Sequence, residues 1–554
     1  MKSRAEALDA LASRTFDVCV IGGGATGAGC ALDAQLRGLQ TALIDAGDFA
    51  SATSSASTKL VHGGVRYLQE AVAHADLEQL SVVKHALRER IFMLNNAPHL
   101  AHRLEFIVPC FSSFDLAYYG VGMKIYEWIA SRATLGPSRI LSRNGALCEL
   151  PDLNPAGLRG AVSYWDGQFD DARYCVTLMK TFANAGGEAA NYLKAVEFEK
   201  DAGRRLREVK VEDQRSRQTF AIRAHAFVNA TGPFSDRLRI LVNPSASERL
   251  APSKGVHILL PLQNGIFRAL LIPKTEDGRV SFAIPWRGRL LVGTTHQEDE
   301  LSDELCVTQQ EVDYLLRHLN QYVSKQYGRD DIVAVFSGVR PLVRSAHSET
   351  KELARDHVIE VDRPSGLVSI LGGKWTTYRY MAEQTIDALQ REAPYSSSNG
   401  LSSPSKTRQH LLAGAEGYTD DSWRLLIRDY ALEEATAHHL SEKFGTDAYR
   451  VLALAKENPD LRQPVVVGGT PIQAEVVYCS RNEMACTIED VLARRIGMQF
   501  YSLAMAITAA PVVASHLAQE LGWSRQDEVA AVDEYVQKIR GIQHAAGIVS
   551  ELIH

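Results

Sequence analysis

The chain has 554 residues, which is more than a single domain usually contains. Its composition is that of a soluble globular protein, with 45% hydrophobic and 23% charged residues, and its net charge of −6 argues against nucleic acid as a partner. The eight cysteines are scattered without a C-x-x-C pair, which predicts buried free thiols in a reducing compartment and excludes a disulfide or zinc framework.

The first predicted elements form a strand, a glycine-rich turn and a helix. Residues 16–21 are apolar and rich in β-branched side chains, as in a buried parallel strand, and residues 28–37 have a helical pattern. The turn between them has the spacing Gly-x-Gly-x-x-Gly. The first glycine allows a tight turn, the second lets the backbone approach a pyrophosphate, and the third lets helix and strand pack closely. The helix N-terminus offers N–H groups and a partial positive charge to the phosphates. The expected contacts are Gly22, Gly24, Ala25, Thr26 and Gly27.

The next predicted strand, residues 40–44, ends at Asp45. A carboxylate at this distance from the glycine turn can accept hydrogen bonds from a ribose hydroxyl. Together these features predict a dinucleotide site, but they do not separate NAD from FAD.

Three later segments favour FAD. Residues 51–59 are a run of small hydroxyl side chains that can lie along the pyrophosphate and the flavin edge. Residues 227–233 are a strand that stops on a Thr-Gly turn, which admits close backbone contact with a ligand. Residues 367–378 are a strand, a glycine pair and a helix start, which could stabilise negative charge on a reduced flavin. Residues 195–198 are expected to form a strand that packs on adenine. The further candidate cofactor contacts are Thr53, Ser54, Ser57, Lys59, Leu60, His62, Val196, Ala230, Thr231, Gly232, Gly373, Lys374 and Thr376.

Several long motifs resemble the aerobic, FAD-dependent glycerol-3-phosphate dehydrogenases. The first is Ser-Ser-Ala-Ser-Thr-Lys-Leu-Val-His-Gly-Gly-Val-Arg-Tyr at 54–67, and the similarity extends from about residue 16 to 540. Two positions depart from the family pattern: Asp45 stands where Glu is commoner, and Trp375 stands where smaller residues are frequent. The other matching segments are 164–173, 253–257, 338–342, 372–379 and, in the family's C-terminal helical domain, 475–495.

The resemblance implies an α/β fold: an FAD-binding Rossmann-like domain of the GR2/DAO type with an inserted antiparallel-sheet substrate domain, plus a C-terminal mainly helical domain. We expect an oxidoreductase region over 10–395, a linker rich in serine over 396–404 and the helical domain over 405–554. The FAD domain would take about 10–75, 155–250 and 335–395, and the substrate domain about 76–154 and 251–334.

Oxidation of a secondary alcohol by flavin needs a base for the hydroxyl proton and a pocket that holds the alcohol. His62 and His257 are the two histidines inside the family motifs, and either could be the base. Lys374 could polarise the substrate oxygen or the flavin N5 side. The resemblance implies Arg340 and Arg355 as a pair that binds the substrate phosphate. The first motif adds the substrate-binding candidates Arg66 and Tyr67.

Two neighbouring groups have a structural alternative. Arg344 lies four residues from Arg340, so one of the two could be only a surface or ion-pair residue. The charges Asp170, Asp171 and Arg173 favour a structural ion-pair network over a catalytic role.

The resemblance implies oxidation of sn-glycerol 3-phosphate to dihydroxyacetone phosphate, with non-covalent FAD and a membrane quinone as the electron acceptor. A close alternative is an oxidase that uses O2, although the inserted segment of such oxidases is absent here. A less favoured one is an amine or amino-acid oxidase on the same flavin fold, and a flavoprotein kept as a binding subunit is the non-enzymatic alternative. The resemblance is also compatible with a homodimer.

Two segments bear on membrane contact. Residues 496–519 contain no Asp, Glu, Lys or Arg, but they do contain several neutral polar side chains. We therefore expect two buried helices rather than a transmembrane span, the second starting at Pro511. Residues 114–130 are crowded with aromatic and aliphatic side chains, which fits either a half-buried helix or an interfacial helix on a bilayer. Residues 1–15 have no apolar core, so neither a secretory signal nor a transit peptide is expected. Together with the membrane quinone that the resemblance implies, these features lead us to expect a cytoplasmic protein, peripheral on the inner face of the cell membrane.

Overall fold

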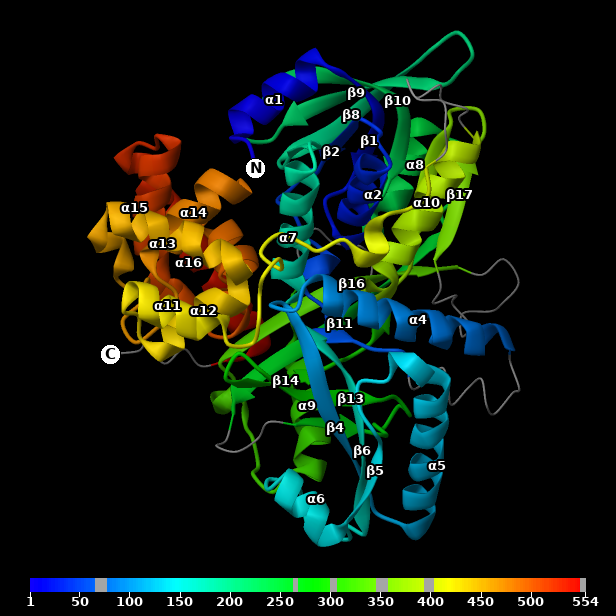
Figure 1. Cartoon of the computed structure of the whole chain (residues 1–554), viewed down its shortest axis with the longest axis vertical. Helices are drawn as coiled ribbons and strands as arrows, with labels where there is room; N and C mark the ends of the chain where they lie inside the picture. The colour runs from blue at the N-terminus through cyan, green and yellow to red at the C-terminus, as the bar shows by residue number, and fades with distance from the viewer. Residues whose placement is uncertain (65–76, 263–267, 299–305, 345–356, 393–402, 549–554) are drawn as a thin grey trace.

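The computed structural model describes residues 1–64, 77–262, 268–298, 306–344, 357–392 and 403–548. Figure 1 shows three parts: a sheet with helices at the top, a second sheet with helices below it, and a group of helices at the left. We call these the first sheet, the second sheet and the C-terminal helical domain.

The first sheet is built around parallel strands. The glycine motif joins β1 to helix α2, and the chain returns to pair β2 beside β1. On the other side β10 is also parallel to β1, and β18 is parallel to β10. Its strands are β17 (Val358–Asp362), β18 (Leu367–Leu371), β10 (Thr219–Asn229), β1 (Thr15–Ile21), β2 (Thr41–Ile44) and β7 (Glu188–Ala190), with β9 (Leu206–Asp213) paired to β10 and β8 (Leu193–Lys200) paired to β9. The helices around it are α1 (Arg4–Ser13), α2 (Ala25–Leu36), α7 (Asp171–Asn184), α8 (Ser235–Val242) and α10 (Tyr378–Glu392).

The second sheet is mainly antiparallel, and β4 and β12 are its parallel pair among the strands described. Its strands are β15 (Gln297–Glu298), β11 (Leu250–Pro261), β14 (Arg289–Gly293), β13 (Ser281–Trp286), β12 (Ala269–Ile272), β4 (Ala101–Cys110), β6 (Gly160–Phe169), β3 (Leu60–Val61), β16 (Ala334–Val343) and β5 (Arg139–Ser142). Its helices are α4 (Leu77–Asn96), α5 (Ser113–Ala130), α6 (Arg143–Glu149) and α9 (Gln309–Tyr322).

The C-terminal helical domain shares its hydrophobic core with the second sheet. The ring of Phe500 packs edge-on against Phe336 of β16 at 5.1 Å, and the backbone N–H of Leu503 donates to Val333 O at 3.0 Å. The two parts therefore pack against each other through a shared apolar core. The helices are α11 (Ser422–Tyr430), α12 (Glu434–Phe444), α13 (Ala448–Glu457), α14 (Gln473–Glu483), α15 (Leu503–Leu521) and α16 (Arg525–Ala546), with a π-helical turn at Asp490–Arg495.

The predicted fold class is confirmed: a Rossmann-like sheet, a second mainly antiparallel sheet and a helical C-terminal part are all present. Three strands lie in a different sheet from the one that the expected boundaries imply. β3, β6 and β16 all pair in the second sheet, although 10–75, 155–250 and 335–395 were expected in the FAD domain. The domain boundaries themselves stay a prediction, and most of the expected linker lies outside the described residues.

The prediction that a new helix starts at Pro511 is wrong. Pro511 lies inside α15, which continues through it to Leu521. A proline costs a helix one backbone hydrogen bond, but here the apolar face of the helix on either side is buried and holds the segment in place. Within the described part of the chain, none of the helices is both long enough and apolar enough to cross a membrane. All eight cysteines are free, and six of them are buried.

Candidate active site

The turn after β1 has room only for glycine at two of its positions. Gly22 has a φ of +112°, and a Cβ there would lie 2.4 Å from the carbonyl oxygen of Ala230. A Cβ on Gly27 would lie 1.7 Å from Gly22 O, so α2 packs directly against the turn. Gly24 is the N-cap of α2 and makes no side-chain cap. The first turn of α2 therefore directs a partial positive charge to the position expected for the pyrophosphate. The predicted contacts Ala25 and Thr26 lie in this first turn.

The hydroxyl-rich segment 51–59 is held against this turn from several directions. Ser54 Oγ accepts a hydrogen bond from the backbone N–H of Ala25 at 2.9 Å, and Trp375 Nε1 donates to Ser54 O at 3.0 Å. Thr53 Oγ1 donates to Val339 O in β16 at 2.6 Å. The segment thus connects the helix of the glycine motif with the second sheet.

Asp45 lies where β2 ends, next to the glycine turn. Its carboxylate accepts hydrogen bonds from the backbone N–H groups of Gly23 at 2.6 Å and Gly47 at 2.8 Å. Burial raises the pKa of Asp45 to about 6, against the lowering effect of these two N–H groups. The carboxylate therefore stands beside the turn, as the ribose contact requires.

The segments predicted to face the flavin meet the same turn. A Cβ on Gly22 would touch both Ala230 and Thr231, which directly follow β10, and Gly232 comes next with a φ of +58°. From the other side, the backbone N–H of His62 donates to Thr376 Oγ1 at 3.2 Å. Gly373, just before, has a φ of +95°, and a Cβ there would lie 2.2 Å from Met381 Cε.

These residues fit FAD. The glycine turn leaves a cradle that any side chain would fill, the N-terminus of α2 faces it, and a carboxylate stands at the end of β2. The loops after β10 and β18 are the segments predicted to make the additional contacts that a flavin needs beyond the dinucleotide. The individual contact residues stay predictions.

His257 and Arg340 lie on the neighbouring strands β11 and β16 of the second sheet: Arg340 pairs with Ser253, and its guanidinium reaches over Gly255 toward His257. His257 is 2% exposed; its Nε2 shares a hydrogen bond of 2.9 Å with Thr58 Oγ1, and its ring stacks on Phe336. Arg340 Nη2 donates to Thr294 Oγ1 at 2.8 Å. Burial lowers the pKa of His257 well below its usual range, and the positive charge of Arg340 lowers it further. At neutral pH the imidazole is therefore uncharged.

His62 lies near Lys374, next to the start of the segment that follows β18. Burial lowers the pKa of His62; the carboxylate of Asp166 opposes this, and the ammonium of Lys374 adds to it. His62 is therefore also neutral at pH 7. His62 belongs to the 51–62 stretch, and His257 contacts the same stretch through Thr58. Both histidines therefore stay candidates for the base.

Three predicted contacts have other surroundings. Lys59 is buried, and its Nζ donates to Asp171 Oδ1 at 2.5 Å and to Ser55 O at 2.6 Å, so its charge is already paired. Leu60 lies in the short strand β3, paired with β6. Val196 lies in β8 at a β-bulge between Ala195 and Glu197. The predicted contacts Arg66, Tyr67 and Arg355 lie outside the described residues.

The charges at the start of α7 form a structural ion-pair network, as predicted. Both Arg173 Nη atoms donate to the carboxylate of Glu483 at 2.6 Å, and Lys443 Nζ donates to Asp170 Oδ2 at 2.6 Å. These pairs join α7 to the C-terminal helical domain. The charges of Asp170 and Arg173 are therefore neutralised by protein partners and are not candidates for binding a substrate.

Sequence reasoning missed three polar residues of this region. Thr58 forms a hydrogen bond with His257. It lies inside the predicted hydroxyl run, so the run indicated a polar contact in this stretch. Thr294 bonds Arg340 from a turn that carries no motif. Asp48 lies three residues beyond Asp45 and has partners near residue 490, which no local pattern can indicate.

Two family models match the chain. Residues 17–379 match the FAD dependent oxidoreductase model, and residues 405–528 match the C-terminal domain of alpha-glycerophosphate oxidase.

Relatives of known name are similar over most of the chain. A probable mitochondrial glycerol-3-phosphate dehydrogenase of Caenorhabditis elegans is 40% identical, covering 94% of this chain and 72% of its own length. The mitochondrial glycerol-3-phosphate dehydrogenase of Homo sapiens is 39% identical, with 92% and 71% covered. Among solved structures, the glycerol-3-phosphate dehydrogenase from Bacillus halodurans complexed with FAD matches with a TM-score of 0.79 and 28% identity, covering 99% of both chains.

We predict that Gly24→Val abolishes FAD retention. The new side chain would start 2.9 Å from Ser54 Oγ and would occupy the approach to the N-terminus of α2. FAD content per protein after purification measures the effect. Gly122→Val is the matched control, because a Cβ there meets nothing within 4 Å. Full FAD content in the Gly24 variant would contradict the assignment of this turn.

Proposed function

We propose that this chain, which belongs to the FAD-dependent glycerol-3-phosphate dehydrogenases, oxidises sn-glycerol 3-phosphate to dihydroxyacetone phosphate. The observation in the structure that supports this most directly is the neutral, buried His257 beside the guanidinium of Arg340. A proton acceptor next to a fixed cation is what oxidation of a phosphorylated alcohol needs.

The reaction removes two hydrogens from the secondary alcohol. The hydroxyl proton goes to a base, for which the candidates are His257 and His62. Bound FAD supplies the acceptor for the hydride from the carbon. His257 is held in place by the Thr58 hydroxyl and by stacking on Phe336, so its ring needs no reorientation when substrate binds.

Arg340 is our candidate for binding the substrate phosphate. Its guanidinium lies over Gly255, where a Cβ would come within 2.4 Å of Nη2. The hydrogen bonds to Thr294 Oγ1 and Thr295 O fix the plane of the group. A planar, fixed guanidinium is well suited to a phosphate dianion. Arg66, Tyr67 and Arg355 stay proposed partners of the same substrate, and Lys374 stays the group proposed to polarise its oxygen.

We predict that Arg340→Ala raises KM for sn-glycerol 3-phosphate by about 10- to 100-fold while FAD content stays unchanged, because a charge-assisted contact to the phosphate is lost. Steady-state kinetics and the flavin-to-protein ratio measure the two quantities. Arg344→Ala is the control; Arg344 is exposed and lies 3.9 Å from Glu248. Loss of FAD from the Arg340 variant, or an unchanged KM, would show that Arg340 is structural.

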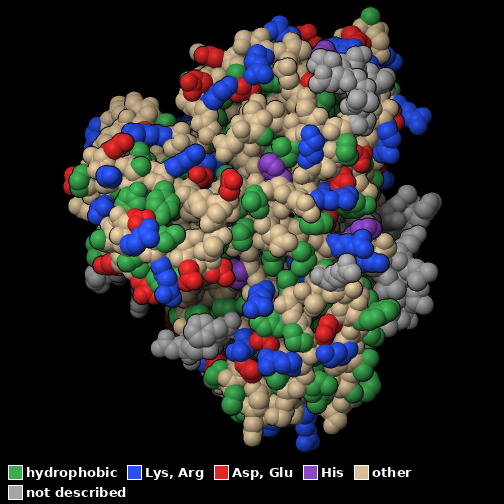
Figure 2. All heavy atoms as spheres, viewed as in Figure 1, with side chains coloured by type: hydrophobic (Ala, Val, Ile, Leu, Met, Phe, Trp, Pro, Cys, Tyr) green, Lys and Arg blue, Asp and Glu red, His purple; other side chains and the backbone are tan. Residues whose placement is uncertain are grey.

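For the electron acceptor we propose a quinone in a membrane that the protein contacts peripherally. Helix α5 supports this. Its inner face, including Met123 and Tyr126, is buried, yet its outer face is also apolar. Figure 2 shows hydrophobic side chains along the lower right of the molecule, where Figure 1 places α5. The exposed apolar residues of this stripe are Phe114 at 75%, Tyr118 at 44%, Val121 at 61% and Trp128 at 80%.

The spacing of these residues puts them on one side of the helix, as in helices that lie in the headgroup region of a bilayer. In a monomer such a stripe would be left against water at a cost in free energy. We therefore propose that α5 is the segment that contacts lipid and that the protein is peripheral on the inner face of the cell membrane.

We predict that Phe114→Ser/Trp128→Ser weakens binding to phospholipid vesicles about tenfold or more, because two large apolar side chains no longer enter the lipid. The turnover rate of the double variant with quinone dissolved in the vesicles should fall, while its turnover rate with a water-soluble dye as electron acceptor should not. Val467→Ser is the control, since Val467 is 96% exposed but lies in the C-terminal helical domain. Equal vesicle binding by wild type and double variant would refute the role of α5, and rapid turnover with O2 alone would favour the oxidase.

A further inference from the structure

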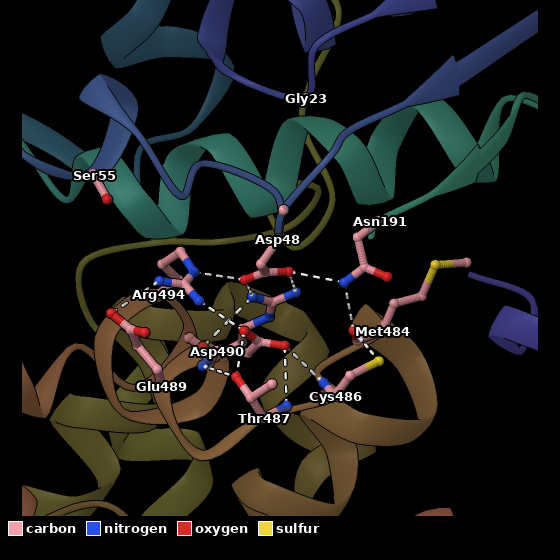
Figure 3. A network of polar contacts seen from close by, with 12 residues as sticks. Gly23, Asp48, Ser55, Asn191, Met484, Cys486, Thr487, Glu489, Asp490 and Arg494 are labelled. Carbon is pink, nitrogen blue, oxygen red and sulfur yellow. Dashed lines mark hydrogen bonds and ion pairs between the residues drawn. The ribbon is translucent and has the colours of Figure 1, made fainter. Parts of the chain in front are cut away.

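A buried carboxylate at the junction of the first sheet and the C-terminal helical domain holds two arginines. Asp48 is 1% exposed, and its Oδ2 accepts a hydrogen bond from Arg494 Nε at 2.6 Å. Arg495 donates to the same carboxylate through both Nη atoms, with Nη2 at 2.9 Å from Oδ1. Figure 3 shows Asp48 pointing from its loop down toward the turn that carries Arg494. We call Asp48, Arg494 and Arg495 the arginine clamp.

The local backbone makes this arrangement possible. Consecutive side chains of a regular helix point about 100° apart and would not normally reach one group. Here residues 490–495 form a π-helical turn, and both arginines contact the same carboxylate. Such turns occur frequently at functional sites. The clamp therefore depends on an irregular turn of the C-terminal helical domain.

The loop that carries Asp48 also shapes the glycine turn. A Cβ on Gly23 would lie 2.8 Å from the ring of Phe49 and 3.2 Å from Asp45 Cβ. The backbone N–H of Ala50 donates to Gly23 O at 3.1 Å. Along the chain, Asp48 thus lies between residues that contact the turn: Asp45 precedes it, and Phe49 and Ala50 follow it. A displacement of Asp48 must move these contacts.

A second connection runs parallel to the clamp. The backbone N–H of Tyr192 donates to Gly47 O at 2.8 Å, and its hydroxyl donates to Asp490 Oδ1 at 2.6 Å. Arg494 Nη2 donates to the same oxygen at 2.7 Å. The loop between Asp45 and Asp48 is therefore tied to the π-helical turn at both Gly47 and Asp48.

We propose that the arginine clamp makes the C-terminal helical domain a determinant of FAD affinity: Asp48, Arg494 and Arg495 are positioning residues that hold the Asp45 loop against the adenosine side of the cofactor. The proposal rests on the FAD site described above. It concerns cofactor affinity and not the identity of the substrate.

Electrostatics gives the proposal a specific signature. The charged or titratable groups around Asp45 are Asp48 on its own loop, Cys175 on α7 and Arg494 on the π-helical turn. Burial raises the pKa of Asp45 to about 6; Asp48 adds to the rise, and Arg494 opposes it. An ionised Asp45 accepts hydrogen bonds from ribose better than a protonated one, so FAD affinity should fall as the pH falls through this range.

The test is the pH dependence of FAD affinity in two variants. FAD-free protein is titrated with FAD between pH 5 and pH 8 by flavin fluorescence, and the wild-type Kd should rise about tenfold toward pH 5. Arg494→Gln removes a cation and should move the midpoint to higher pH. Asp48→Asn removes an anion and should move it to lower pH. Both variants should bind FAD at least about threefold more weakly at pH 8, because the loop is no longer held.

The opposite directions separate positioning from a general loss of structure, which would shift both midpoints alike or neither. The double variant Asp48→Asn/Arg494→Gln removes one charge of each sign and should return the midpoint toward that of the wild type, which keeps the test usable if a single variant folds poorly. Arg481→Gln is the matched control, since Arg481 pairs with Glu520 at the surface of the same domain. Midpoints that do not move, or that move together, would overturn the proposal. Wild-type protein that binds FAD but does not oxidise sn-glycerol 3-phosphate would overturn only the proposed substrate.

Discussion

Residues 45–62 are held by all three parts of the molecule, and both sides of the site depend on this stretch. Asp45 accepts from the glycine turn of the first sheet, and Thr53 donates to β16 of the second sheet. Asp48 is held by arginines of the C-terminal helical domain, and Thr58 bonds His257. The backbone that faces the cofactor and the side chain that orients the candidate base thus belong to one continuous segment. The glycine turn and the surroundings of His257 therefore share one backbone segment.

Buried charge is distributed unevenly around that segment. Where the domains meet, carboxylates and cations form close pairs, such as Arg173 with Glu483 and Lys59 with Asp171. Breaking one partner of such a pair leaves a buried charge, which typically costs about 3–5 kcal/mol. His257 differs, because it is buried beside a cation and is therefore kept neutral. The charges at the junction are paired in packing contacts, whereas His257 is uncharged at neutral pH.

Features that depend only on residues close together in the chain could be predicted from the sequence. The glycine motif, the acid at the end of β2 and the hydroxyl run could all be predicted, since each is a local backbone or spacing requirement. The partner of Lys59 could not, because Asp171 lies 112 residues away and approaches only through α7. The arginine clamp spans 446 residues between Asp48 and Arg494 and depends on a π-helical turn that no periodicity indicates. At Pro511 a local rule failed because tertiary burial on both sides outweighed the lost hydrogen bond.

The reaction itself is tested most directly by mixing FAD-loaded protein with sn-glycerol 3-phosphate in the absence of oxygen and of any other acceptor, and recording the visible spectrum of the flavin. We predict that the absorbance of oxidised flavin is bleached by this substrate and not by glycerol, which lacks the phosphate. A spectrum that stays unchanged with sn-glycerol 3-phosphate, in protein that retains its full complement of FAD, would contradict the proposed function.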